Sequence, residues 1–122
     1  MSWLRHGYGE NSGAISLTSG SEWTDVCTVT VNVDPNKLLI RATWVATAAT
    51  SAGTFRVTVD GSVTKTAPAP TGEHAGCIDD RATIGTPGSH TVKLQCQRGQ
   101  VVLSTLDVAA NAATLTVEEV SS

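Results

Sequence analysis

The sequence predicts an all-β protein, specifically an antiparallel jelly-roll-type β-sandwich of eight or nine strands. Segments of alternating apolar and polar residues recur along the chain, and turn residues separate them at short intervals. No convincing 3.6-residue helical period is present outside the ambiguous range 101–113. Val and Thr are abundant, and both favour half-buried strand surfaces. With 122 residues, the chain is long enough for one domain with its own core.

The first expected strands come before the middle of the chain. Residues 14–19 form a weak strand, residues 25–33 a strong one that ends at a turn, and residues 37–47 alternate again. The side chains expected to face the core from the second and third of these strands are Cys27, Val29, Val31, Val33, Leu38, Ile40, Ala42 and Trp44.

A hairpin is predicted at the dipeptide Asp60-Gly61, because this pair favours a two-residue turn between antiparallel strands. It joins an expected strand at 54–59, with Phe55, Val57 and Val59 inward, to one at 62–66. Residues 67–76 contain two prolines and two glycines and are expected to form the longest loop.

The last third of the chain contains the clearest alternation. A Pro87-Gly88 turn leads into a strand at 89–97, with His90, Val92, Leu94 and Cys96 expected to face the core. Further strands are expected at 77–84, 100–106 and 113–120. Mixed long and short connections favour a jelly roll.

An immunoglobulin-like sandwich is the alternative fold. Cys27, Trp44 and Cys96 resemble the Cys-Trp-Cys spacing of that fold, but Leu94 stands where its conserved tyrosine is expected. The sequence leaves open whether Cys27 and Cys96 form a disulfide, and in a reducing compartment buried free thiols are favoured.

The opening segment, residues 1–13, has three glycines and no alternation, and is predicted to be an arm in front of a sandwich domain at 14–122. Trp3, Leu4, Arg5 and Tyr8 lie within eight residues of each other. Trp, Tyr and Arg dominate the energetics of protein interfaces. We therefore predict that these four residues bind a partner, the alternative being that Trp3 and Tyr8 pack on their own sandwich.

Composition disfavours several function classes. The net charge is −3 and Lys and Arg are not clustered, so no nucleic-acid partner is expected. No stretch approaches the roughly 20 apolar residues of a membrane span, and no membrane partner is expected. Residues 1–8 lack the apolar region of a signal peptide, and the three cysteines are widely spaced, which together predict synthesis in a cytoplasm.

No enzyme, cofactor or metal is expected. The chain has no Gly-x-Ser-x-Gly motif, and His90 is expected to be a core-facing histidine bonded to a backbone group. Asp79 and Asp80 should face opposite sides of a strand. His74 and Cys77 have metal-ligand spacing, but a zinc site needs a second pair of ligands and none is present.

The pattern of strands 54–61, 87–95 and 115–119, with the Arg98-Gly99 turn, resembles small sandwich domains of tailed bacteriophages over residues 50–122. Such domains occur as capsid decoration proteins and as heads of tail fibres. The resemblance implies a virion structural protein, a capsid decoration (cement) protein that binds the major capsid protein on the outside of the head as a homotrimer. Assembly would occur in the host bacterial cytoplasm. The alternative is a receptor- or carbohydrate-binding head domain of a tail fibre or minor tail protein.

Overall fold

The computed structural model describes residues 6–34 and 37–120, and within these ranges all regular structure is β-strand. In chain order the strands are β1 (His6–Glu10), β2 (Ile15–Leu17), β3 (Thr24–Val33), β4 (Lys37–Ala49), β5 (Gly53–Val59), β6 (Ser62–Ala69), β7 (Gly72–Thr83), β8 (Gly88–Gln97), β9 (Thr105–Val108) and β10 (Ala113–Val120). The described part of the chain contains no helix with the length and hydropathy needed to cross a membrane.

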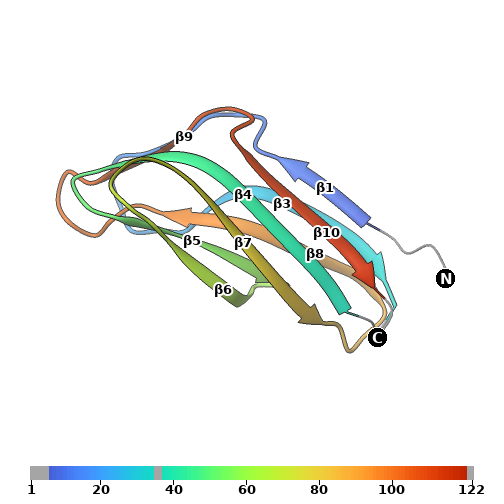
Figure 1. Cartoon of the computed structure of the whole chain (residues 1–122). Helices are drawn as coiled ribbons and strands as arrows, with labels where there is room; N and C mark the ends of the chain where they lie inside the picture. Colours follow the sequence, from blue (N-terminus) through green and yellow to red (C-terminus); the bar gives the residue numbers. More distant parts are fainter. Residues whose placement is uncertain (1–5, 35–36, 121–122) are drawn as a thin grey trace.

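The strands form two antiparallel sheets that face each other (Figure 1). In sheet A, the long strand β4 pairs with β7 on one side; on the other it pairs first with β10 and then with β9. Strands β1 and β2 lie outside β10 and β9. Sheet B has the order β3-β8-β5-β6. Because the chain passes repeatedly between the sheets, the fold is the predicted jelly-roll sandwich.

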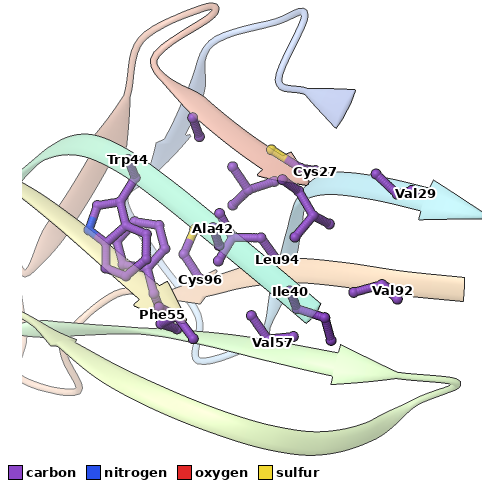
Figure 2. Close-up of a cluster of buried hydrophobic side chains, with 14 of the residues drawn as sticks. Cys27, Val29, Ile40, Ala42, Trp44, Phe55, Val57, Val92, Leu94 and Cys96 are labelled. Atoms are coloured by element: carbon purple, nitrogen blue, oxygen red, sulfur yellow. The ribbon is translucent and has the colours of Figure 1, made fainter. Parts of the chain in front are cut away.

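The core lies between the sheets and is made by alternate residues of each strand. Within it the rings of Trp44 and Phe55 stack with centroids 4.2 Å apart. Figure 2 shows the two rings against each other. Every residue predicted to face inward is buried. Val26 is buried as well, because a bulge between Asp25 and Cys27 interrupts the alternation of β3.

The free cysteines do not support the immunoglobulin alternative. Cys27 and Cys96 are buried free thiols on β3 and β8, which are neighbours in sheet B. The immunoglobulin disulfide instead joins the two sheets. Burial raises the pKa of Cys27 to about 11 and that of Cys96 to about 12, so both thiols are unreactive and serve as small core side chains.

The prediction that residues 1–13 contain no strand is wrong for residues 6–10, which form β1 against β10. The two glycines of β1 hid it, because they face β3 and contribute no side chain to the alternation. A Cβ added to Gly7 would lie 2.4 Å from Cγ1 of Val29, so the strand approaches β3 closely because Gly7 has no side chain. Trp3, Leu4 and Arg5 lie outside the described residues.

The predicted loop at 67–76 is also wrong. Strand β6 continues to Ala69 and β7 begins at Gly72, so a two-residue turn joins them. Pro68 is tolerated because β6 is an edge strand of sheet B, where one side of the backbone needs no partner. The predicted strand at 100–106 is a loop over most of its length, and the strand itself begins at Thr105.

Candidate functional site

The loop between β8 and β9 exposes three consecutive apolar side chains. Val101, Val102 and Leu103 retain 56%, 80% and 79% of their accessible surface. Most other large apolar side chains in the described ranges are buried in the core. A run of exposed apolar residues is unfavourable in water unless it serves an interaction. We call residues 101–103 the apolar tip.

The base of the apolar tip is held by the side chain of Arg98. Its Nη1 atom donates to the carbonyl oxygens of Gly99, Val101 and Ser104 at 3.1, 3.3 and 3.3 Å. The N–H of Ser104 also donates to the carbonyl of Val101, at 3.1 Å. The one charged side chain of this loop therefore points into the loop backbone and fixes its shape.

The loop between β4 and β5 supports the apolar tip from the side. The hydroxyl of Thr50 donates to the carbonyl of Leu103 at 3.2 Å, and the hydroxyls of Ser51 and Ser104 are hydrogen-bonded at 2.7 Å. A Cβ on Gly99 would lie only 1.8 Å from Oγ of Ser51. The two loops thus interlock at one end of the sandwich.

Backbone strain is concentrated at the same place. Thr50 and Leu103 have φ angles of 75° and 69°. These lie in the left-handed region, which residues other than Gly, Asn and Asp rarely adopt. Such conformations persist only where the surrounding structure enforces them, and they cluster at functional sites. The apolar tip is therefore a preformed, rigid projection suited to burial in a partner.

Of the four predicted partner-binding residues, only Tyr8 lies in the described ranges. It is 60% exposed on the outer face of sheet A, and its cross-strand neighbours in order are Thr116, Arg41 and Asp79. Beside it is a shallow hollow of about 760 Å³ lined by Leu39, Ile40, Arg41, Asp79, Asp80, Arg81, Thr116 and Glu118. Strand β1, which carries Tyr8, and the loop between β8 and β9, which carries the apolar tip, lie toward opposite ends of the sandwich (Figure 1). Tyr8 and the apolar tip therefore belong to two separate surfaces.

His90 has the structural role expected from the sequence. Its Nδ1 lies 2.6 Å from Oδ2 of Asp60, and its Nε2 lies 2.8 Å from the carbonyl oxygen of Thr86. The hydrogen bond to Asp60, with the Thr86 carbonyl second, raises the pKa of His90. The same bond lowers the pKa of Asp60. Both ring nitrogens are engaged, and the pair fastens the β5–β6 turn to β8.

The other titratable residues considered from the sequence do not converge. Asp79 forms an exposed ion pair with Arg41 at 2.7 Å, whereas Asp80 lies on the opposite face of β7. His74 and Cys77 also lie on opposite faces of β7, and His74 accepts a hydrogen bond from the indole of Trp44 at 3.2 Å. Residues 6–34 and 37–120 contain no group of three or more His, Cys, Asp or Glu able to hold a metal.

The apolar tip was missed because residues 100–106 were interpreted as a strand. The signal was nevertheless present, since Val101, Val102 and Leu103 are three consecutive apolar residues and cannot all face one side of a strand. Such a run must either be buried on both faces or lie in a loop.

Neither a protein-family model nor a curated protein matches the sequence. Solved structures share the fold at low identity. The Eiger TNF from S. frugiperda has a TM-score of 0.59 at 5% identity, over 97% of this chain and 93% of that one. The infectious bursal disease virus Gt strain structure has a TM-score of 0.52 at 14% identity, over 98% of this chain. The dimeric latent PorU from Porphyromonas gingivalis has a TM-score of 0.54 at 9% identity, over 97% of this chain.

The chain spans 38% of the viral chain and 13% of the PorU chain. At these identities the likeness establishes the fold alone, a jelly-roll sandwich. What the domain does must be argued from its surface.

Proposed function

We propose that the protein is a non-catalytic virion structural protein, a capsid decoration protein that binds the outside of a bacteriophage head. The apolar tip carries this proposal, because its three exposed side chains are held rigidly and have no role in the protein's own core. In this proposal the tip seats in an apolar depression of the major capsid protein.

The energetics of the apolar tip fit a contact of this kind. Full burial of a Val or Leu side chain stabilises a complex by about 1.5–3 kcal/mol. Because the loop is already ordered by Arg98 and Thr50, little conformational entropy is lost on binding. A protein that binds only the assembled shell stabilises that shell by mass action. Several copies bound on the capsid exterior would multiply the effect.

The alternative is a receptor- or carbohydrate-binding head domain of a tail fibre or minor tail protein. One observation favours it: Trp23 lies at the same end of the sandwich as the apolar tip, because the next residue, Thr24, pairs with Cys96 near the end of β8. The guanidinium of Arg56 lies 3.9 Å from the centre of its ring, so this aromatic face is partly occupied within the protein. For this reason the capsid proposal is preferred.

Cosedimentation with empty, expanded heads of the phage that encodes the chain tests the proposal. The wild-type protein should pellet with heads, and Val102→Ser should weaken this binding at least tenfold. Val63→Ser is the matched control, because Val63 is also an exposed valine, at 48%, but lies on β6. Glycan-array binding without head binding would support the alternative and overturn the capsid proposal.

The predicted contribution of Trp3, Leu4 and Arg5 needs a separate variant. Removing residues 1–5 leaves β1 intact, and a loss of head binding in this variant would assign part of the contact to them. Unchanged binding would leave the apolar tip as the contact and refute the prediction for these three residues.

A further inference from the structure

Strand β7 has one free edge. It is 12 residues long (Gly72–Thr83) and pairs with β4 along one side, and no described strand forms a backbone ladder with its other side. A long unpaired edge presents a row of backbone donors and acceptors and is a template for pairing with another strand. The chemistry of this edge therefore indicates what would bind to it.

The backbone groups at this edge belong to the odd-numbered residues of β7. The N–H of Val45 donates to the carbonyl of Ala112 at 3.0 Å, so the odd-numbered residues of β4 turn their backbone away from β7. In an antiparallel ladder it follows that the even-numbered residues of β7 direct their backbone N–H and C=O groups toward β4. The odd-numbered residues direct theirs toward the free edge. A hydrogen bond of 2.9 Å from Nζ of Lys65 on β6 to the carbonyl of Asp79 agrees with this direction.

Two buried polar atoms on the inner face of β7 have no hydrogen-bond partner: Nδ1 of His74 and Oδ2 of Asp80. An indole N–H can only donate, so the bond from Trp44 makes Nε2 of His74 the acceptor. The neutral ring then has its proton on Nδ1. The edge thus carries one unpaired donor and one unpaired acceptor, six positions apart, and buried polar groups are normally paired.

We propose that a second copy of this chain adds to the free edge of β7, antiparallel and centred on Cys77, so that the two copies of sheet A become one continuous sheet. In this register His74 lies opposite Asp80 of the second copy, which supplies the missing donor–acceptor pair on the inner face. On the outer face Glu73 lies opposite Arg81 of the second copy. Both pairs occur twice, because the contact is two-fold symmetric.

Neighbouring registers lose this complementarity. With the centre at Gly76, Glu73 lies opposite Asp79, which places like charges together. With the centre at Ile78, His74 lies opposite Ala82, and the polar atom stays unpaired. Other registers place odd-numbered residues opposite even-numbered ones. The N–H and C=O groups at the free edge then lack partners, because the even-numbered residues of the second copy direct theirs toward its own β4. The register centred on Cys77 therefore satisfies the backbone and both pairs of side chains.

The inference goes beyond the proposed function and does not depend on it, since it concerns how two copies of the chain meet. Sedimentation equilibrium of the full chain should give twice the protomer mass of 12.6 kDa, or an even multiple of it. A monomer at high concentration, or a trimer, would overturn the proposal.

Oxidative cross-linking tests the register. In a hydrogen-bonded antiparallel pair the two Cα atoms are about 5.5 Å apart, within the range that a disulfide spans. Cys77 is exposed whereas Cys27 and Cys96 are buried, so a mild oxidant that accepts the two electrons and two protons of two thiols should link Cys77 to its copy. Cys77→Ser should abolish the cross-link, and a dimer whose Cys77 does not react would place the contact elsewhere.

Charge exchange tests the same register without relying on the thiol. Glu73→Arg and Arg81→Glu should each raise the dissociation constant of the dimer about tenfold, because like charges then lie opposite. The double variant should restore wild-type association. Glu10→Arg, on β1 at the opposite edge of sheet A, is the matched control and should leave association unchanged. Equal weakening in the double variant would overturn the register.

Discussion

Gly76 is the position at which one added methyl group should cost the most. A Cβ there would lie 2.6 Å from Cε2 and Cζ2 and 2.7 Å from Nε1 of Trp44. The indole cannot easily move away, because it stacks on Phe55 at 4.2 Å and donates to His74. Inserting a methyl group into a packed core costs about 1–3 kcal/mol. With three ring atoms closer than contact distance, we expect Gly76→Ala to lower the free energy of unfolding by about 2–3 kcal/mol.

Urea unfolding followed by far-ultraviolet circular dichroism measures this loss. A double-mutant cycle with Trp44→Leu isolates the cause, because leucine lacks the ring atoms that the methyl group meets. In that background Gly76→Ala should cost less than about 0.5 kcal/mol. Gly85→Ala is the matched control, since nothing lies within 4 Å of a Cβ added there. An equal loss with and without Trp44 would refute the steric argument and indicate a backbone effect.

Three further predictions concern the ends of the strands. Hydrogen bonds raise the pKa of His90 above 6.5. The stabilising pair of protonated His90 with Asp60 should therefore be fully formed below pH 6.5 and lost as the pH rises through the folded-state pKa. The difference in unfolding free energy between wild type and His90→Gln should shrink over that pH range. Asn11→Ala removes a buried amide whose Oδ1 accepts from the N–H of Ala113 at 2.8 Å, and chemical denaturation should show a loss of about 2–4 kcal/mol. Leu103→Asn should keep stability within about 1 kcal/mol, because Asn tolerates positive φ, but should abolish head binding; a thermal melt and cosedimentation distinguish the two effects.

The sequence predicted those parts of the fold in which alternating apolar residues or a turn dipeptide directly indicate the local structure. In 92–96 and 113–117 every second residue is apolar, and the structure buries those residues. The Asp60-Gly61 turn was predictable because both residues adopt positive φ, 51° and 86°, as a tight hairpin requires. These features are local, so no knowledge of distant strands was needed.

The missed features depend on partners that are distant in the sequence. Strand β1 needs glycines because Val29 lies against it, and that contact joins residues more than twenty positions apart. Pro68 fits β6 only because that strand is at an edge. The shape of the apolar tip depends on Thr50, which precedes it by about fifty residues. No local pattern contains these three facts.

The apolar tip has a mechanical consequence, because its loop begins in one sheet and ends in the other. Strand β8, which enters the loop, belongs to sheet B, and β9, which leaves it, belongs to sheet A. A pulling force on a partner bound at residues 101–103 is therefore divided between two layers, and a pull directed along the strands loads both sheets in shear. Such loading shears many hydrogen bonds at once, whereas a tip mounted on a single hairpin would open them one after another. The domain is thus built to resist tension at this end.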